Sequence, residues 1–263
     1  MKILAIIVLL LVPSTYYTIK RNRAWRNLFD LCGYDLIHSA KSAKVNAQFA
    51  GLMMNRVYTA KPEEQQSALR FLTPTITYYF RKALAIYPSN YQTLNDLGTV
   101  YVNFAGNPDS AIFFLKKAIA LNPKFQPAWV NLGLAYRKNQ QYDSALYCYR
   151  KVLEQDPREV KALIAMANVY NDIGDFEKAV KMNEEAMELN PESDLPYRNI
   201  ANYYIQRGDT ADAVHSWEKA VQINPAYDIC IQLNSLYRIR GDMEKATYYY
   251  ELAMESSRKS NKK

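Results

Sequence analysis

The chain has 263 residues, with 49% hydrophobic side chains, only eight glycines and a formal net charge of +7. No Ser/Gly or Gln/Asn tract separates one part from another, which excludes a low-complexity chain and favours one elongated α-rich array. Of the 33 Lys and Arg, 8 lie in residues 1–60 and 4 in residues 258–263; of the 26 Asp and Glu, 2 lie in residues 1–60, so residues 61–257 hold 21 basic against 24 acidic side chains. Because this middle part is slightly acidic, we expect no phosphate-binding groove and no nucleic-acid partner.

Residues 1–19 contain an unbroken apolar run from Ile3 to Val12 that extends to Ile19 without a charge. Residues 3–19 reach the lower length limit for a helix that crosses a bilayer, so we expect a transmembrane anchor. The alternative is a signal peptide with Lys2 as its positive region and cleavage near Ser14. The basic residues at 20, 21, 23 and 26 outnumber Lys2, and by the positive-inside rule they favour a cytoplasmic position for the chain that follows.

Residues 20–60 are predicted to form a basic, helical juxtamembrane segment, and residues 61–90 a degenerate helix-pair unit. Lys61-Pro62 marks a break. Thr73-Pro74 is predicted to open a second helix over residues 75–87, because proline suits the first turn of a helix. The matching first helix is expected within residues 43–72.

Residues 91–259 repeat with a spacing set by five prolines, each after an Ala-rich apolar segment: 88, 123, 157, 191 and 225. A spacing of about 34 residues is typical of an array of helix pairs. In each pair the first helix supplies a small residue where the second supplies alanine, which lets the two backbones approach closely. These small residues are Gly98, Gly133, Ala167 and Ala201, opposite Ala111, Ala145, Ala179 and Ala213. Tyrosines at 101, 136, 170, 204 and 237 recur with the repeat and are predicted to pack in the core.

In most units a glycine suited to a left-handed turn lies between the first and the second helix, at 106, 174, 208 and 241. The segment from Lys138 to Gln141 takes that place in the second unit. The whole pattern resembles the tetratricopeptide repeat (TPR), with five units over residues 91–259. This resemblance implies an all-α superhelical solenoid of antiparallel helix pairs, preceded here by the N-terminal apolar helix. Asn183 at a usually aromatic position and Asn234 at the Gly/Ala position depart from the family pattern. Residues 260–263 are expected to be a solvated basic tail.

The TPR resemblance implies that the first helix of each pair lines a concave groove. Side-chain amides in such a groove can bond both the carbonyl and the amide of an extended peptide. Alternatively, Arg198 and Asn202, one helical turn apart, could receive a carboxylate. A purely structural interpretation is that the candidate groove residues face solvent or bond neighbouring helices. The candidate groove residues are Asn95, Thr99, Asn131, Asn168, Arg198, Asn199, Asn202 and Gln232.

Catalytic chemistry is not indicated by the sequence. It contains no phosphate-binding loop, paired-histidine metal motif or nucleophile motif, so we expect no catalytic residue, no cofactor and no metal. His215 is predicted to be solvated or to have a packing role, and the three cysteines have no metal-ligand spacing.

Residues 18–46, from Thr18-Ile19-Lys20-Arg21 to Ser42-Ala43-Lys44, are similar to the junction between the last membrane helix and the repeats of transmembrane and TPR-containing glycosyltransferase-like proteins. That resemblance implies repeats on the periplasmic or lumenal side. We therefore expect a non-catalytic, single-pass membrane scaffold whose groove binds a protein or peptide of the membrane or envelope. The alternatives are a non-catalytic subunit or C-terminal fragment of a membrane glycosyltransferase that presents acceptor proteins, a cytosolic-facing signalling scaffold, and a protein secreted after signal cleavage.

Overall fold

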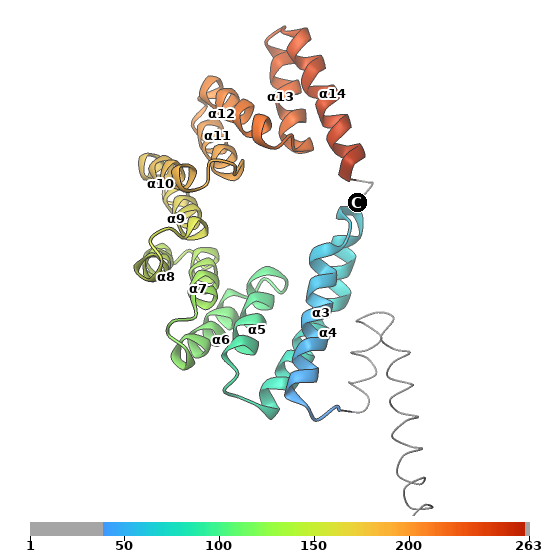
Figure 1. Cartoon of the computed structure of the whole chain (residues 1–263), viewed down its shortest axis with the longest axis vertical. Coiled ribbons are helices and arrows are strands. Elements are labelled where there is room, and N and C mark those ends of the chain that lie inside the picture. The colour runs from blue at the N-terminus through green and yellow to red at the C-terminus, as the bar shows by residue number, and fades with distance from the viewer. Residues whose placement is uncertain (1–38, 261–263) are drawn as a thin grey trace, which may run out of the picture. The chain divides into compact units, whose positions relative to one another are not determined.

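The computed structural model describes residues 39–260, and every regular element in that range is an α-helix (Figure 1). The all-α prediction is therefore confirmed, whereas the predicted apolar helix lies outside the described residues. The helices are α3 (Ala43–Thr59), α4 (Pro62–Ile86), α5 (Tyr91–Asn103), α6 (Pro108–Leu121), α7 (Gln126–Lys138), α8 (Tyr142–Gln155), α9 (Val160–Asp172), α10 (Phe176–Leu189), α11 (Leu195–Arg207), α12 (Thr210–Ile223), α13 (Tyr227–Ile239) and α14 (Met243–Ser260). The chain divides after Asn139 into two compact units.

Unit 1 contains α3 to α7, each packed against the next helix in sequence. Local side chains set the helix starts. The side-chain oxygen of Asn90 accepts a hydrogen bond from the backbone N–H of Thr93 at 3.1 Å, which satisfies one of the free donors at the start of α5. Asn107 caps α6 in the same way, and Pro108 follows it in the first turn, where its missing N–H costs nothing.

Helices α3 and α4 form the first described pair, and the predicted break at Lys61-Pro62 is confirmed because α3 ends and α4 begins there. Phe49 and Ala50 are buried on α3, and Ile76 and Phe80 on α4. The sequence suggested a boundary between residues 60 and 61, and this helix pair spans it: α3 lies in the predicted juxtamembrane segment and α4 in the predicted degenerate unit.

Pro74 lies inside α4, so the prediction that a helix opens at Thr73-Pro74 is wrong. The proline ring removes one backbone donor, yet its fixed φ is compatible with a helix. The hydroxyl of Thr73 donates to the carbonyl oxygen of Leu69 at 2.6 Å on the same stretch. Burial of Ile76 and Phe80, both 0% exposed, stabilises the continued helix and offsets the lost bond.

Unit 2 contains α8 to α14, with the pairs α9 and α10, α11 and α12, and α13 and α14. The predicted turn glycines are confirmed: Gly208 between α11 and α12 has a φ of 84°, and Gly174 and Gly241 are also left-handed. Gln140 takes the same kind of conformation with a φ of 58°, although it has a β-carbon. Gln140 therefore makes the left-handed turn that glycine makes in the other units, within the segment from Lys138 to Gln141 that the sequence predicted to replace it.

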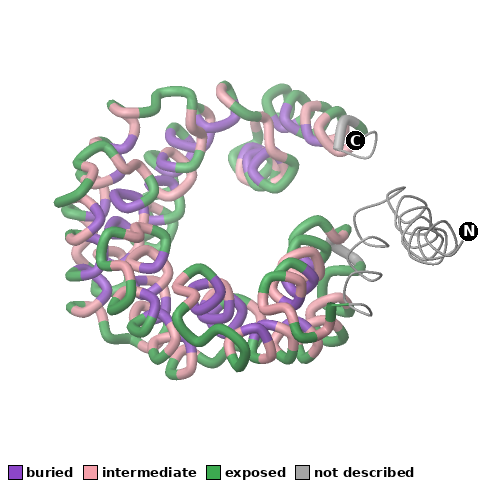
Figure 2. The backbone as a smooth tube through the Cα atoms, turned by 60° about the horizontal axis from the view of Figure 1, so that its bottom comes forward, coloured by how far each residue is buried: buried purple, intermediate pink, exposed green. Residues whose placement is uncertain are grey.

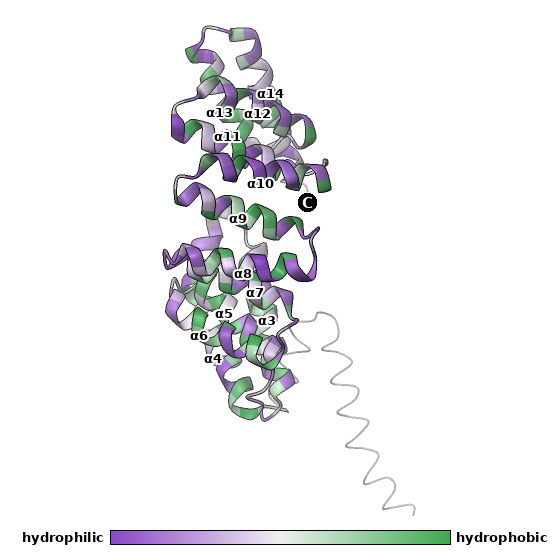
Figure 3. Ribbon diagram, turned by 90° about the vertical axis from the view of Figure 1, so that its left-hand side faces the viewer, coloured by the Kyte–Doolittle hydropathy of each residue, from purple (hydrophilic) through white to green (hydrophobic). Residues whose placement is uncertain are grey.

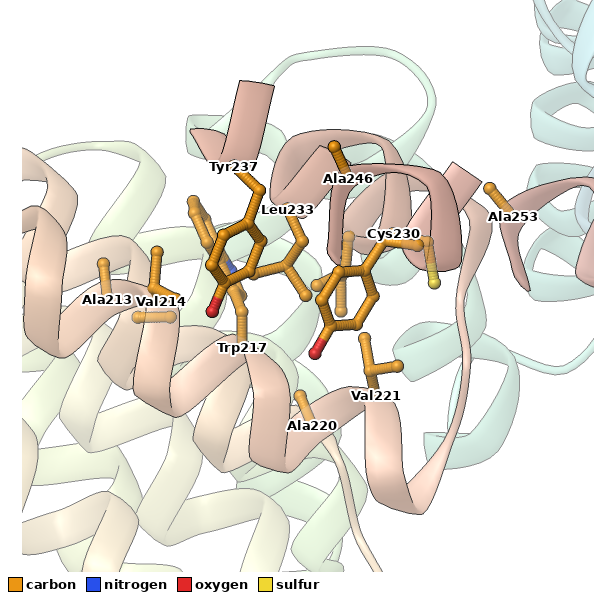
Figure 4. Close-up of a cluster of buried hydrophobic side chains, with 13 residues drawn as sticks. Ala213, Val214, Trp217, Ala220, Val221, Cys230, Leu233, Tyr237, Ala246 and Ala253 are labelled. Carbon is orange, nitrogen blue, oxygen red and sulfur yellow. The ribbon is translucent and has the colours of Figure 1, made fainter. Parts of the chain in front are cut away.

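The core of unit 2 is built from the faces that consecutive helices share, as the buried positions in Figure 2 and the side chains in Figure 4 show. Trp217 of α12 lies against Leu233 and Tyr237 of α13, and all three are almost fully buried. Among the five recurrent tyrosines, Tyr101 and Tyr237 are buried as predicted, and the other three are half-buried.

Asn234 occupies the position where the earlier pairs have glycine or alanine. Its side-chain nitrogen donates to the backbone carbonyl oxygen of Ala246 on α14 at 2.6 Å. An amide at this position therefore replaces a close backbone approach with a direct hydrogen bond between the two helices.

Candidate functional site

Three candidate residues of unit 1 bond one another across neighbouring first helices. The side-chain nitrogen of Asn131 on α7 donates to Asn95 Oδ1 and to Thr99 Oγ1 on α5, both at 2.9 Å. The hydroxyl of Thr99 donates in turn to the backbone carbonyl oxygen of Asn95 at 2.9 Å. Asn95 is buried, with 7% of its surface exposed. This set, which we call the α5–α7 amide cluster, ties two repeats together.

Asp96 lies beside this cluster and accepts a hydrogen bond from Asn95 Nδ2 at 3.2 Å. Burial raises the pKa of the Asp96 carboxyl above its ordinary value, and the bond from Asn95 lowers it by a smaller amount. Asp96 lies two residues after Leu94, as Asn131 lies two residues after Trp129, so the two hold the same position of successive repeats. In the first repeat this position carries a carboxyl group whose charged form is disfavoured by burial.

Two candidate residues of unit 2 belong to a second network. The hydroxyl of Tyr203 on α11 donates to Asn168 Oδ1 on α9 at 3.1 Å and accepts from Asn183 Nδ2 on α10 at 3.4 Å. Asn199 Nδ2 donates to Asn183 Oδ1 at 3.4 Å, and Asn183 Nδ2 also donates to the Ala179 carbonyl oxygen at 2.9 Å. Asn183 is fully buried. Its departure from the family pattern is therefore explained: the amide satisfies polar groups that three helices bring together.

Arg198 is engaged by carboxylates of its own chain. Its guanidinium lies 2.7 Å from Asp228 Oδ2 on α13 and 3.6 Å from Asp194 Oδ2 one turn earlier. These contacts are partly exposed, so each contributes little to stability. The two carboxylates nevertheless engage the guanidinium that would bind a ligand carboxylate, so such a ligand would have to displace Asp228.

Asn202 and Gln232 are the two candidate residues with free amides. Both are exposed, and neither makes a hydrogen bond with another of the described residues. They lie on the first helices α11 and α13, where exposed aliphatic side chains accompany them: Leu195, Ile205 and Ile239, the last with 82% of its surface exposed. We call this set the α11–α13 face. It combines unpaired amides with apolar side chains on neighbouring helices.

Other potentially reactive groups do not form a centre with these residues. His215 is exposed on α12, and Cys148 and Cys230 are buried free thiols. Burial raises the pKa of the Cys230 thiol to about 11, which keeps it protonated at neutral pH. Over residues 39–260 no three His, Cys, Asp or Glu side chains are placed to hold a metal ion, and no helix is long and apolar enough to span a bilayer. The membrane segment expected at residues 3–19 lies outside the described range.

Comparison with known proteins identifies the repeats. Four family models described as tetratricopeptide repeat match residues 91–125, 127–159, 148–181 and 197–224. The chain is a tetratricopeptide-repeat protein. No curated protein sequence matches it significantly.

Several solved structures share this fold. The type IV pilus biogenesis factor PilW is 15% identical over 79% of this chain and 90% of its own, with a TM-score of 0.62. The protein pilF of Pseudomonas aeruginosa is 16% identical over 84% of this chain and 97% of its own, with a TM-score of 0.58. YrrB, described as a TPR protein with an unusual peptide-binding site, is 18% identical over 74% and 92%, with a TM-score of 0.51. At these identities the likeness shows the fold of this TPR protein.

Sequence reasoning found the positions on the first helices but missed their partners. Tyr203 was not among the candidates, because it does not lie at a recurrent tyrosine position, and the role of Asn183 was visible only as a departure from the pattern. The sequence could indicate only that an amide at a core position such as Asn183 needs hydrogen-bond partners. Which helices supply these partners depends on the packing.

Proposed function

We propose that this TPR protein is a non-catalytic, membrane-anchored scaffold that binds an extended segment of a partner protein along its first helices. The observation that carries the proposal is the α11–α13 face. Asn202 and Gln232 present amides with free donors and acceptors, and the exposed side chains of Leu195 and Ile239, each about two turns away on the same helix face, offer apolar contacts. An extended backbone has one donor and one acceptor per residue, which side-chain amides can satisfy with little demand on sequence.

The two hydrogen-bonded networks define the rest of the surface. Asn131 and Asn199 are among the predicted groove residues, but their amides bond Asn95 and Asn183 of neighbouring helices. We therefore assign them the task of fixing the spacing of the first helices, and we place the direct contacts at the free amides of the α11–α13 face. The fold of YrrB carries a peptide-binding site in that protein, which agrees with this use of the architecture.

The test is an affinity comparison on a defined probe. A displayed library of random peptides is selected on the full chain, and the best peptide is synthesised. Replacement of Asn202 and Gln232 together by alanine should weaken its binding by roughly thirtyfold, because each lost hydrogen bond is worth about 1 kcal/mol. The matched control replaces Lys181 and Glu188, both exposed on α10, by alanine and should leave affinity unchanged. Equal affinities for both double variants would refute the proposal.

The membrane part of the proposal is supported by the apolar run over residues 3–19 and, for repeats on the outer side, by the glycosyltransferase-like junction over residues 18–46. A reporter that is active on only one side of the membrane, fused after Lys263, tests it. Activity outside together with a retained N-terminal segment supports an envelope partner, or a subunit that presents acceptors to a separate glycosyltransferase. Activity inside would favour the cytosolic scaffold.

A further inference from the structure

A hollow of about 210 Å³ opens on unit 2 where α10 and α12 leave part of α11 uncovered. Val180 and Met187 of α10 and Tyr197, Ile200 and Tyr204 of α11 line it. An apolar cavity of about 150 Å³ is enough to hold a benzene molecule. The hollow is therefore large enough for a sizeable apolar side chain, and it lies apart from the free amides of the α11–α13 face.

The rim of the hollow carries charges that are ordered along the helices. Asp212, His215 and Lys219 line it from α12, and Glu184 lines it from α10. All four are exposed, and none makes an ion pair or a hydrogen bond with another described residue. Asp212 and Lys219 are seven residues apart, which places them about 10 Å apart along the axis of α12. The rim thus has a carboxylate and an ammonium group at opposite ends of one face of α12, and Glu184 adds a second carboxylate from α10. In Figure 3 most of α10, which carries Glu184, has the colour of hydrophilic residues.

The outer face of α14 is uncovered in a way that the earlier second helices of unit 2 are not. At the position of Tyr250, α8 has Tyr149, α10 has Asn183 and α12 has Trp217, and these three are 1%, 0% and 5% exposed. Tyr250 is 49% exposed. No described helix covers this face of α14, so an apolar surface of the kind that each repeat normally buries against its neighbour remains open.

Charges on this face of α14 have the same spacing as those of the rim. Met254 and Arg258 lie three and seven residues after Glu251, so all three share one side of the helix with Tyr250. Glu251 and Arg258 are exposed, and neither pairs with another described residue. The helix therefore offers an acid and a base about 10 Å apart, with Met254 between them and Tyr250 beside Glu251.

We propose that α14 of a second copy of this chain lies in the hollow, antiparallel to α12. Arg258 of the second copy then meets Asp212, Glu251 meets Lys219, and Met254 with Tyr250 fills the apolar floor, where His215 borders the contact. The two surfaces differ, so the contact is head-to-tail and leaves a free hollow and a free α14 at the ends of each assembly. One helix in one hollow makes a small interface, and we expect weak, concentration-dependent association.

The test is sedimentation velocity of the full chain from about 1 µM to about 1 mM, the range of weak complexes. A mild detergent keeps the apolar run over residues 3–19 from driving association. The mass of the natural chain should rise with concentration. Lys219→Glu and Glu251→Lys should each abolish the rise, because each places like charges together. An equimolar mixture of the two variants should restore it, since every contact between them again pairs opposite charges.

Matched controls make the same charge changes elsewhere in unit 2: Lys161→Glu on α9 and Glu192→Lys before α11, both exposed. They should associate like the natural chain. Circular dichroism confirms that all variants are folded. A natural chain that stays monomeric at every concentration would overturn the proposal. Association that survives both single variants, or a mixture that fails to restore it, would also overturn it.

Discussion

Gly98 on α5 should be a position where one added methyl group destabilises the protein. A β-carbon built there would lie 2.6 Å from Leu115 Cγ, 2.9 Å from its Cδ2 and 3.2 Å from its Cδ1. Carbon atoms pack comfortably at about 3.5–4.0 Å, so Leu115 or the helix would have to move by about 1 Å. Leu115 is fully buried and has little room to do so.

The expected magnitude follows from two opposing terms. Overpacking of this kind costs about 1–3 kcal/mol, whereas alanine is favoured over glycine inside a helix by about 1 kcal/mol. Gly98→Ala should therefore lower the free energy of unfolding by about 1 kcal/mol, and by no more than about 2 kcal/mol. Gly51 on α3 provides a matched control, because a β-carbon there would meet nothing within 4 Å. Gly51→Ala should stabilise the protein by up to about 1 kcal/mol.

A double-mutant cycle separates the clash from other effects. Leu115→Ala alone should cost about 2–5 kcal/mol, as buried leucines do. In that background the methyl group of Gly98→Ala has space, so the same substitution should become stabilising. Urea unfolding followed by far-ultraviolet circular dichroism gives each free energy, provided the slope is unchanged. If Gly98→Ala were as stable as the natural protein, or if its cost persisted in the Leu115→Ala background, the packing of α5 on α6 described above would be wrong.

Three further predictions concern the turns, the buried network and the acidic side chain. Gln140→Gly should raise the free energy of unfolding by roughly 1 kcal/mol, because glycine adopts the positive φ of 58° without strain. Gly208→Ala, at a φ of 84°, should lower it by a similar amount. Thermal melts that shift in the opposite directions would contradict these turn conformations. Tyr203→Phe should cost about 1 kcal/mol by removing the hydroxyl that joins α9, α10 and α11, and an unchanged melting temperature would mean that the network adds nothing to stability. Asp96→Asn should be more stable than the natural protein at pH 7, since the raised pKa of Asp96 means that its ionised form is penalised in the folded state. That penalty is relieved as the pH falls through the folded pKa toward the ordinary value, so the difference in stability between variant and natural protein should shrink in acid. A stability difference that grows in acid would contradict the raised pKa.

Much of the fold could be predicted from the sequence because the repeat constrains every level at once. The recurrent prolines, the small residues at Gly98 and Ala201 and the left-handed glycines all agree with one helix-pair geometry. Pro74 was misread because a proline alone does not distinguish the start of a helix from its interior. The burial of Ile76 and Phe80 decided the matter, and burial depends on the three-dimensional packing.

The candidate site could be predicted only as a set of positions. The sequence placed Asn131 and Asn202 on the same kind of helix face, yet the structure gives them different environments: Asn131 bonds two residues of α5, and Asn202 is exposed without a partner. The difference arises from what neighbouring repeats present, Asn95 and Thr99 in one case and solvent in the other. Variants of Asn131 are thus expected to change stability as well as binding, which makes Asn202 the cleaner probe.

Mapping a bound peptide tests the central claim most directly. The peptide selected on the full chain is synthesised with a photoreactive residue at its centre, cross-linked to the unaltered protein and located by mass spectrometry. The account predicts cross-links within Leu195–Arg207 and Tyr227–Ile239, the first helices that carry Asn202 and Gln232. Cross-links confined to the second helices α10 and α12 would contradict it.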